Sequence, residues 1–345
     1  MRYSLQFPSG TTEYYFDSSF AELDQVVSGR RIIVLTDSNV YDAYKPLISR
    51  FDIIVVRAGE QSKSWQGVSD VIKQLVELEA DRTTLLVGVG GGMITDLAGF
   101  VASVYMRGIS FGFVPTTLLC MTDAAIGGKN GVNVGLYKNL MGVIKQPEFI
   151  IYETAFLKSL NRTEWSNGFA EVIKYGCIFD SFLFEELHEN DLEYYMQDGA
   201  INSIVQKCAD WKNKTVIDDE RETGIRKLLN FGHTVGHAIE NMMDLPHGFA
   251  VSIGMVVESR LSETLTGMSA DISKLLRRTL TRYHLPTHID IDVAKAMDIL
   301  KMDKKRRGDT IDIVTLEKIG KARVQPVPPE YIERELNNFI HAGDH

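Results

Sequence analysis

Short runs of apolar, mostly β-branched residues recur through the first part of the chain, and each run ends at a polar residue or a glycine. They cover residues 31–36, 52–57 and 83–88, and residues 65–79 carry apolar side chains at helical intervals. Continuous apolar strands separated by amphipathic helices are typical of a parallel sheet covered on both faces. The pattern predicts a doubly wound α/β fold for this part of the chain.

The pattern of hydrophobic and polar residues changes after about residue 155. Two further strand-like runs, residues 111–117 and 149–152, end the first part, and almost everything from about 160 to 302 then follows a helical pattern. Near the end, residues 310–315 and 321–326 alternate in the manner of a small β-hairpin.

These patterns predict two domains, which is also what a length of 345 residues favours. We expect a Rossmann-like parallel-sheet dinucleotide-binding domain over residues 1–155. A mostly α-helical metal- and substrate-binding domain with a small C-terminal hairpin is expected over residues 156–345.

Composition and charge narrow the class of protein. With 44% hydrophobic and 24% charged residues the chain has the composition of an ordinary globular protein. The formal charge of −9 argues against nucleic acid as a partner, because phosphate backbones require basic surfaces. Three widely spaced cysteines indicate a reducing compartment, and we find no signal peptide or membrane-length apolar run. We therefore expect a cytoplasmic enzyme without a membrane partner.

A glycine-rich turn follows the third predicted strand, at Gly90-Gly91-Gly92, and leads into a helix. Backbone amides in such a turn, together with a helix N-terminus, can bind the phosphates of a nucleotide, although the pattern is not the usual dinucleotide fingerprint and a plain βα turn remains open. Asp37 and Glu60 follow earlier strands, where carboxylates can bind ribose hydroxyls. Carboxylates there would repel a 2′-phosphate, which favours NAD over NADP.

Residues 123–133 read as a glycine-dense loop, with Asp123 at its start, Lys129 within it and Lys138 soon after. Lysines on glycine-rich loops suit a phosphorylated ligand. The alternative is that these lysines are simply solvated, as most surface lysines are.

The segment 224–240 carries an unusual set of polar residues. If it is helical, Arg226, Asn230, His233 and His237 share one face, which would ordinarily be apolar. Two histidines one turn apart can point at one cation, and His247 follows in a turn-like context. A metal site is the first hypothesis, and a solvated surface stripe is the alternative.

An earlier predicted helix adds an acidic candidate. Glu171 and Lys174 are three residues apart and share a helix face within an apolar stretch, although such pairs are usually solvated surface pairs. Glutamate with two histidines is a known ligand set for catalytic zinc. A divalent cation near a nicotinamide would favour oxidation of an alcohol.

Taken together, these motifs resemble those of the 3-dehydroquinate synthases. The similarity is carried by Gly90-Gly91-Gly92 with the following segment to Phe100, and by residues 105–108, 114–119, 123–133, 138–140, 170–176, 226–238 and 303–305. It extends from about Asp37 to Lys305, nearly the whole chain.

The resemblance implies one reaction of the shikimate pathway of aromatic amino acid biosynthesis. 3-Deoxy-D-arabino-heptulosonate 7-phosphate becomes 3-dehydroquinate and phosphate. The C5 hydroxyl is oxidised with NAD, phosphate leaves by β-elimination, C5 is reduced again, and the ring opens and recloses by an aldol step. The enzyme is therefore a carbon–oxygen lyase that regenerates NAD in each turnover.

The resemblance also implies the cofactors and their ligands. Zinc, with cobalt as an alternative ion, would be bound by Glu171, His233 and His247, and His237 would transfer protons instead of binding metal. This replaces the hypothesis that both histidines of the pair are ligands. The residues matching NAD-binding positions are Asp37, Asn39, Glu60, Lys63, Gly91, Gly92, Met93, Ile94, Thr95, Asp96, Thr116, Thr117, Asp123, Lys129, Lys138, Phe156, Leu157, Lys158 and Ser159.

Positions that match the substrate site are mostly cationic, as expected for a phosphorylated sugar acid. They are Lys129, Asn139, Lys174, Lys212, Arg226, Asn230 and Lys304. Arg107 matches a residue that reaches the phosphate site of a partner subunit, so the resemblance implies a homodimer.

Four residues depart from the family pattern, and three alternative functions follow from related chemistry. Ala124 and Ala125 replace two serines, Asn130 replaces a threonine and Thr95 replaces a glycine, which leaves details of loop hydrogen bonding open. The alternatives are a sugar-phosphate cyclase that makes an inosose or a valiolone, a metal-dependent polyol dehydrogenase, and a non-catalytic homologue. The cations at the carboxylate-binding positions disfavour the first two, and the intact ligand set disfavours the third.

Overall fold

The structure is a computed structural model, and it describes the chain except for residues 17, 136, 198, 303–305, 308 and 342–345. The chain divides into two compact units. The first comprises Met1–Asn161 together with Ile201–Arg221, and the second comprises Arg162–Ala200 together with Glu222–His345. Within the described residues, no helix has both the length and the apolar composition needed to cross a membrane.

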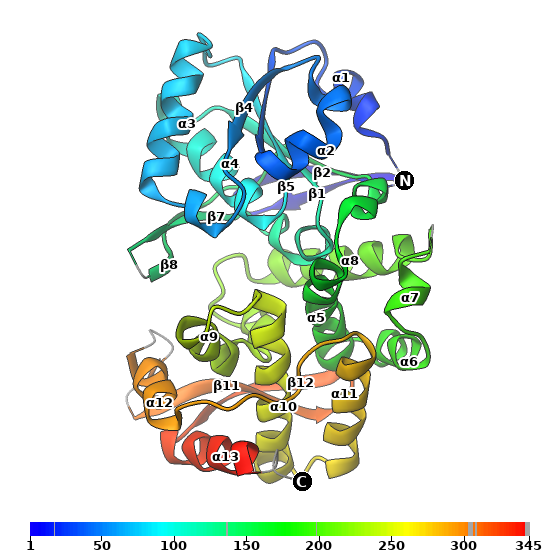
Figure 1. Ribbon diagram of the computed structural model, residues 1–345, viewed down its shortest axis with the longest axis vertical. Coiled ribbons are helices and arrows are strands. Elements are labelled where there is room, and N and C mark those ends of the chain that lie inside the picture. Colours follow the sequence, from blue (N-terminus) through cyan, green and yellow to red (C-terminus); the bar gives the residue numbers. More distant parts are fainter. Residues whose placement is uncertain (17, 136, 198, 303–305, 308, 342–345) are drawn as a thin grey trace. The chain divides into compact units, whose positions relative to one another are not determined.

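The first unit is built on a parallel sheet (Figure 1). Within its described residues, seven strands lie in the order β1-β2-β9-β6-β5-β3-β4, and only the β1–β2 pair is antiparallel. The strands are β1 (Arg2–Phe7), β2 (Gly10–Phe16), β3 (Ile32–Asp37), β4 (Asp52–Val56), β5 (Leu85–Gly90), β6 (Ser110–Pro115) and β9 (Phe149–Tyr152). This confirms the predicted α/β fold class, and the antiparallel N-terminal hairpin is an addition that the sequence pattern did not indicate.

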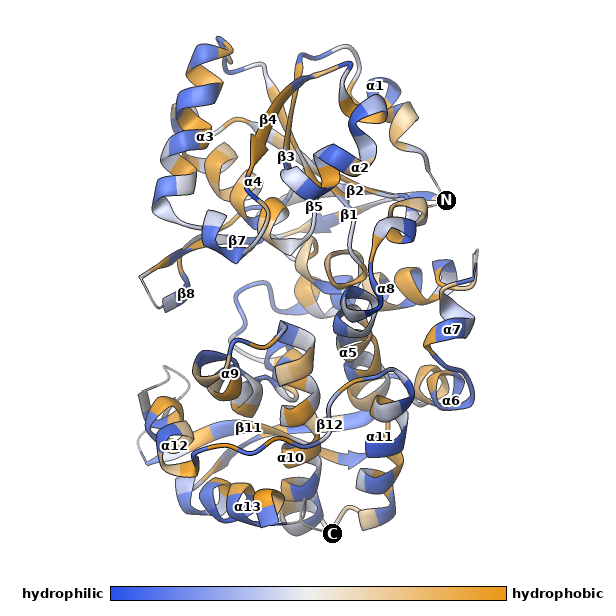
Figure 2. Cartoon of the chain, in the orientation of Figure 1, coloured by the Kyte–Doolittle hydropathy of each residue, from blue (hydrophilic) through white to orange (hydrophobic). Residues whose placement is uncertain are grey.

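Helices cover the central strands β3 and β5, which explains why these two strands are buried along their whole length. All six residues of β3 and all six of β5 are buried, and Figure 2 shows β4 in the hydrophobic colours. The covering helices are α1 (Leu23–Val26), α2 (Ser38–Ile48), α3 (Trp65–Glu77) and α4 (Gly92–Val104), and α8 (Asn202–Asp218) also belongs to this unit. The predicted helix over residues 65–79 is confirmed by α3, which buries Val68, Val71 and Leu75.

The expectation of a loop over residues 123–133 is wrong. Its first residues end a π-helical turn, Cys120–Ala124, and its last residues form β7 (Lys129–Val134), which pairs with β8 (Tyr137–Ile144). A side chain at Gly131 would place its Cβ 2.8 Å from the Met141 carbonyl oxygen, so the hairpin needs glycine where the two strands approach. These glycines interrupt the alternating pattern by which a strand is usually recognised.

The second unit is mainly helical. Its helices are α5 (Arg162–Ile178), α6 (Ser181–Glu189), α7 (Leu192–Tyr195), α9 (His233–Met242), α10 (His247–Thr266), α11 (Ala270–Arg282), α12 (Val293–Met302) and α13 (Pro329–His341). The predicted hairpin is confirmed by β11 (Thr310–Lys318) and β12 (Lys321–Val327), and β10 (Arg306–Arg307) pairs with β11. Helix α10 packs against α5, α9, α11 and β11, so it forms the centre of this unit.

The segment 224–240 is not one continuous helix, which corrects the assumption behind its predicted polar face. Residues Ile225–Asn230 form a 3₁₀ helix, and α9 begins only at His233. Gly232 between them has φ of 78°, a left-handed conformation that ends the first helix and redirects the chain. Arg226 and Asn230 therefore do not share a helix face with His233 and His237.

Candidate functional site

Three side chains from three helices converge in the second unit. Glu171 lies in α5, and His233 and His247 are the first residues of α9 and α10. Oε1 of Glu171 lies 3.2 Å from Nε2 of His233 and 3.3 Å from Nε2 of His247. One potential ligand atom from each residue lies within 4.8 Å of the others. His247 begins a helix, so the turn predicted around it ends just before this residue.

Glu171 is held in its charged form although it is fully buried. Burial alone would raise the pKa of this carboxyl, but the charge of Lys174 and the contacts with His233 and His247 hold that pKa well below its usual value. Lys174, one turn along α5, forms an ion pair with Oε2 of Glu171 and is itself buried. The pair is thus internal, as the apolar residues around it favoured over the usual solvated surface pair, and it leaves Oε1 facing the two histidines.

His233 is oriented by the backbone that precedes it. Its Nδ1 lies 3.1 Å from the carbonyl oxygen of Phe231 and can donate a hydrogen bond to it, which leaves the lone pair of Nε2 directed toward Glu171. Burial lowers the pKa of His233, so the neutral imidazole is favoured. A neutral imidazole with a fixed tautomer is the form that binds a metal ion.

His247 lies between two carboxylates. Its Nε2 faces Glu171, and its Nδ1 lies 3.6 Å from Oε2 of Glu240 in α9. Burial by itself would lower the pKa of His247, but Glu171 and Glu240 outweigh that effect and raise it to about 9. Sequence reasoning missed Glu240, although its position three residues after His237 on one helix was a usable signal.

The ring of His237 lies beside those of His233 and His247. Its ring centroid is 5.4 Å from that of His233 and 6.0 Å from that of His247. His237, Glu240 and His247 form a second set of potential ligands whose atoms also lie within 4.8 Å of one another. The geometry therefore offers two overlapping sets that share His247, and the assignment of His237 to proton transfer stays a prediction.

The donor set Glu171, His233 and His247 fits a divalent cation such as zinc or cobalt. It combines one charged carboxylate with two imidazole nitrogens, which is the ligand chemistry of catalytic zinc sites. A carboxylate from Glu240 behind His247 and a carbonyl behind His233 supply the outer contacts that orient metal-binding histidines.

Two other predicted residues of the second unit, Arg226 and Asn230, lie on the 3₁₀ helix Ile225–Asn230. Arg226 is buried, and Asn230 donates from Nδ2 to Oε1 of Glu222 at 2.6 Å. Lys304 lies outside the described residues.

In the first unit, the glycine-rich turn lies where β5 meets α4. Gly91 is the N-cap of α4 and makes no side-chain capping hydrogen bond. A Cβ on Gly91 would lie 3.1 Å from Cγ2 of Thr117, and one on Gly92 would lie 3.0 Å from Cβ of Ala124. A side chain at either position would therefore pack tightly against its neighbour, and Ala124, one of the departures from the family pattern, is the small residue that faces Gly92.

Several predicted nucleotide ligands in the first unit already contact one another. Asp37 ends β3 and accepts from the backbone N–H groups of Asn39 and Val40, which caps α2. Lys63 is buried and its Nζ lies 2.5 Å from Asp96. Burial raises the pKa of Asp96, and Lys63 opposes this rise.

Other predicted residues of this unit form a second contact group. Lys212 of α8 is buried and lies 2.9 Å from Oδ1 of Asp123. The backbone N–H of Thr116 donates to Gly90, and Oγ1 of Thr117 accepts from the backbone of Cys120. The remaining predicted residues are placed on the β7–β8 hairpin (Lys129, Lys138, Asn139), on the first turn of α4 (Met93, Ile94, Thr95) and on the 3₁₀ helix Thr154–Ser159 (Phe156, Leu157, Lys158, Ser159).

The structure separates these residues into exposed and buried groups. Lys129, Lys138, Asn139 and Arg107 are exposed, whereas the side chains of Ile94, Thr95, Phe156 and Leu157 are buried. Phe156 belongs to the hydrophobic core of the first unit, where its ring meets those of Phe20 and Tyr44. The buried members can therefore approach a nucleotide only through their backbone.

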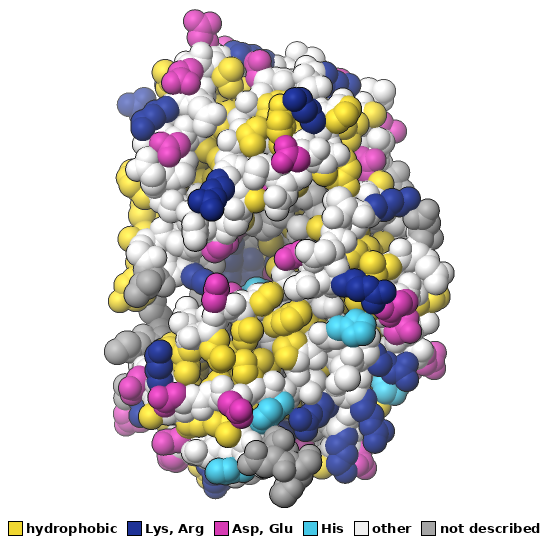
Figure 3. All heavy atoms as spheres, viewed as in Figure 1, with side chains coloured by type: hydrophobic (Ala, Val, Ile, Leu, Met, Phe, Trp, Pro, Cys, Tyr) yellow, Lys and Arg dark blue, Asp and Glu magenta, His cyan; other side chains and the backbone are white. Residues whose placement is uncertain are grey.

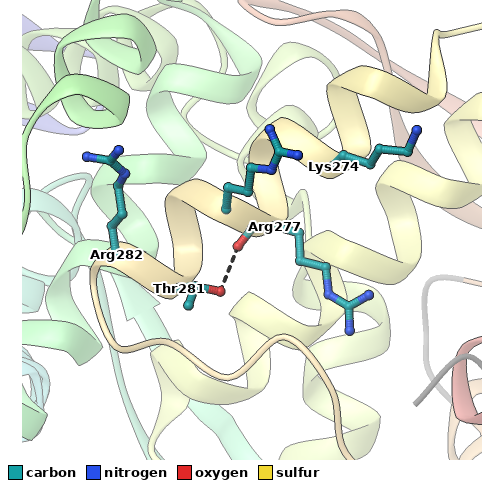
Figure 4. Close-up of a pocket in the computed structure, with 5 residues that line it drawn as sticks. Lys274, Arg277, Thr281 and Arg282 are labelled. Carbon is teal, nitrogen blue, oxygen red and sulfur yellow. Dashed lines mark hydrogen bonds between the residues drawn. The ribbon is translucent and has the colours of Figure 1, made fainter. Parts of the chain in front are cut away.

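A separate open cavity of about 470 Å³ runs along α11 and is lined by Lys274, Arg277, Arg278, Thr281 and Arg282 (Figure 4). Figure 3 shows basic side chains gathered over this helix. None of the predicted site residues that the structure describes lines this cavity, so it is distinct from the candidate metal centre.

Comparison with solved structures defines the class of fold. A 2-deoxy-scyllo-inosose synthase crystallised with carbaglucose-6-phosphate, NAD⁺ and Co²⁺ matches with a TM-score of 0.88 and 23% identity, over 99% of this chain and 100% of that chain. The 2-epi-5-epi-valiolone synthase of Streptomyces hygroscopicus, with NAD⁺ and Zn²⁺ bound, matches with a TM-score of 0.88 over 99% and 98%. A probable glycerol dehydrogenase from Sinorhizobium meliloti matches less well, with a TM-score of 0.61, 16% identity, and coverage of 96% and 97%. The chain therefore shares its fold with these two cyclases.

Sequence comparison is more specific. Residues 53–167 match the family description "3-dehydroquinate synthase N-terminal", and residues 168–306 match "3-dehydroquinate synthase C-terminal". The 3-dehydroquinate synthase of Thermoanaerobacter pseudethanolicus is 36% identical over 94% of this chain and 96% of its own length. That of Pyrococcus furiosus is 38% identical over 94% and 97%. The chain belongs to the 3-dehydroquinate synthase family.

Proposed function

We propose that this protein is a 3-dehydroquinate synthase that converts 3-deoxy-D-arabino-heptulosonate 7-phosphate into 3-dehydroquinate and inorganic phosphate, with NAD and a divalent metal ion as cofactors. The observation that carries the proposal is the convergence of Glu171, His233 and His247 in a chain that matches 3-dehydroquinate synthases over nearly its whole length. The fold alone would not distinguish this activity from that of the other cyclases. The similarity of 36–38% to relatives of one activity does favour it.

Glu171, His233 and His247 are proposed to hold the metal ion. When bound, the ion supplies Lewis acidity that makes the C5 hydroxyl of the substrate easier to deprotonate. His237 is proposed to accept and return protons at its imidazole, since its ring lies 5.4 Å from that of His233 and 6.0 Å from that of His247. Glu240 orients His247 through Nδ1.

The nucleotide is proposed to bind to the first unit through the turn at Gly91 and Gly92. NAD is favoured over NADP because Asp37 and Glu60 place carboxylates at the carboxyl ends of the sheet strands or just beyond them. The proposal assigns NAD binding to the N-terminal domain and metal binding to the C-terminal domain.

The substrate is proposed to be held by cations at its phosphate and its carboxylate. Lys174, Lys212 and Arg226 support this, because all three are buried in a chain of net charge −9. A buried cation is costly unless it meets anions, and an anionic substrate adds to the carboxylates already present. Lys129, Asn139, Asn230 and Lys304 are proposed to complete the set.

Two further features belong to the proposal. A homodimer is proposed in which Arg107 assists the phosphate site of the partner; its exposed side chain, on a residue with φ of 67°, is consistent with such a role. A cytoplasmic location is proposed because the chain has only three cysteines, widely spaced along the sequence, and all of them are buried as thiols.

The test supplies the heptulosonate phosphate to the protein with NAD and zinc, and follows inorganic phosphate and NADH absorbance together. We expect phosphate release without net accumulation of NADH. Persistent NADH would instead indicate a dehydrogenase, and absence of phosphate release would overturn the proposal. Glucose 6-phosphate and sedoheptulose 7-phosphate, which lack the carboxylate, serve as competing substrates, and turnover of either in place of the sugar acid would indicate another cyclase.

A further inference from the structure

The first turn of α9 is capped by a side chain from another helix. A helix begins with backbone N–H groups that have no partner inside the helix, and a serine, threonine or aspartate at the N-cap usually accepts from one of them. Here the N-cap is Gly232, which has no side chain to do so. Glu258 of α10 takes this place: its Oε2 accepts from the Gly232 N–H at 2.8 Å, and its Oε1 faces the Val235 N–H at 3.4 Å.

This arrangement reproduces a capping box with one residue. In an ordinary capping box, the N-cap side chain accepts from the N–H of the third helical residue, and the side chain of that third residue accepts from the N-cap N–H. Val235 is the third residue of α9 and Gly232 is its N-cap, so Glu258 alone supplies both acceptors. The consequence is that the start of α9 is fastened to α10 and not only to itself.

The burial of Glu258 makes its negative charge unfavourable unless the carboxylate has partners that replace water. The side chain is fully buried, and an isolated carboxylate in such a position would be strongly unfavourable. The two backbone N–H groups and the positive end of the α9 dipole offset this cost. An apolar residue at position 258 would fill the same space between the helices but leave the N–H groups of α9 without this acceptor.

Glycines bring the same two helices into backbone contact. A Cβ on Gly254 of α10 would lie 1.9 Å from the carbonyl oxygen of Gly232, and one on Gly236 of α9 would lie 2.9 Å from the carbonyl oxygen of Ala250. These contacts set the distance between α9 and α10. Glycine contacts by themselves would permit sliding along the helices, whereas the hydrogen bonds to Glu258 fix the first turn of α9 at one position.

His233 is the residue between Gly232 and Thr234, and His237 follows one turn later. We propose that Glu258 is a positioning residue for the metal centre: by capping α9 from α10, it holds His233 and His237 in place relative to His247, which begins α10. Glu258 belongs to neither set of potential ligands found among the described residues. This inference rests on the proposed metal-binding function of the same group.

The experiment compares the variants Glu258→Gln and Glu258→Ala with wild type. The glutamine keeps one carbonyl oxygen for the Gly232 N–H, whereas the alanine keeps none. We expect the affinity for Co²⁺, measured by competition with a chelator, to fall about ten- to a hundredfold in Glu258→Ala, the usual range for a residue behind a metal ligand, and less in Glu258→Gln. The visible spectrum of bound Co²⁺ should change in Glu258→Ala, which a merely structural loss of stability would not produce.

Glu335→Gln is the matched control. Glu335 of α13 is also a buried carboxylate that contacts α10, where it lies 2.6 Å from Nε of Arg260. This variant should lower the melting temperature while leaving Co²⁺ affinity and spectrum unchanged. Equal loss of affinity in the control, or wild-type affinity and spectrum in folded Glu258→Ala, would overturn the proposal.

A measurement on the wild type does not depend on the folding of any variant. The amide protons of Gly232 and Val235 should exchange with solvent deuterium as slowly as the core of α10, even without metal. Rapid exchange at both positions would contradict the capping role. If wild type binds no divalent cation while these amides are protected, the proposed function fails and the capping of α9 by Glu258 still stands.

Discussion

Glu171 and Lys174 form an ion pair within α5 in which both side chains are at most 1% exposed. Two charges one helical turn apart normally lie on a surface and contribute little. Here the pair is internal, and the second carboxylate oxygen of Glu171 faces His233 and His247. The lysine therefore balances the carboxylate from one side, and a bound cation would balance it from the other.

Loss of Lys174 should destabilise the metal-free protein far more than the metal-loaded protein. In Lys174→Met the carboxylate of Glu171 remains buried without its lysine, and removal of one partner from a buried ion pair costs about 3–5 kcal/mol. Zinc should restore most of this loss. Urea unfolding with and without zinc measures both values.

Lys227→Met is the control for this prediction, because Lys227 pairs with Asp312 at 3.0 Å in a partly exposed position of the same unit. Its loss of stability should be smaller and independent of zinc. A zinc-independent loss in Lys174→Met would show that the ion does not share Glu171 with the lysine.

Replacement of Glu171 by glutamine should cause loss of the metal ion. The amide keeps the shape of the side chain but carries no charge, so a weak ligand replaces the carboxylate beside His233 and His247. Zinc content after dialysis, measured by mass spectrometry, should fall far below that of wild type. Glu220→Gln is the control. Glu220 is a buried carboxylate of the first unit that accepts hydrogen bonds from Ser9 and Gln146, and its replacement should leave zinc content unchanged.

His237→Ala decides between the two overlapping sets of ligands. If Glu171, His233 and His247 hold the ion, this variant should retain zinc and lose about 10²–10⁴-fold in kcat, as expected when a group that transfers protons is removed. His233→Ala should lose both the metal and the activity. Loss of zinc from His237→Ala with retention in Glu171→Gln would assign the ion to His237, Glu240 and His247.

Metal affinity should rise with pH up to about 9. Glu171 and Glu240 raise the pKa of His247 from 6.5 to about 9, so below that pH a proton occupies the imidazole and must leave when the ion binds. One released proton corresponds to about tenfold in affinity per pH unit. Calorimetric titration with zinc in buffers of different ionisation enthalpy counts the proton.

The raised pKa of His247 also affects the stability of the metal-free protein, which should fall with rising pH while metal affinity rises. For the metal-free protein, a raised pKa of His247 contributes stability that is fully present below pH 6.5 and is lost as the pH rises through about 9. Glu240→Gln should lower the pKa of His247, so that metal affinity stops rising at a lower pH than in wild type. An unchanged pH profile in Glu240→Gln would exclude Glu240 from control of His247.

The strands and helices that alternate in the first unit could be predicted because each is a continuous pattern. A buried parallel strand such as β5 is apolar at every position, and α3 has apolar residues at each turn. The β7–β8 hairpin escaped prediction because glycines at its close approach carry no pattern, and the β1–β2 hairpin has only partial alternation of buried and exposed positions.

The residues of the metal centre were predictable as chemical types but not as a geometry. Histidines at 233 and 237 are one turn apart in any helix, so the sequence indicates that both face the same region. Which of them approaches Glu171 depends on where the helix begins, and Gly232 sets that beginning through a left-handed conformation.

By itself the sequence determined the α/β class, the family motifs and the donors available for a cation, because these depend on local periodicity and on residue type. Only the tertiary structure decided that Glu171 pairs internally with Lys174, that Glu240 lies behind His247, and that Glu258 caps α9. These relationships join residues from different helices, and their distances follow from how α5, α9 and α10 pack together. Spacing along a single helix carries no information about contacts made across such a packing.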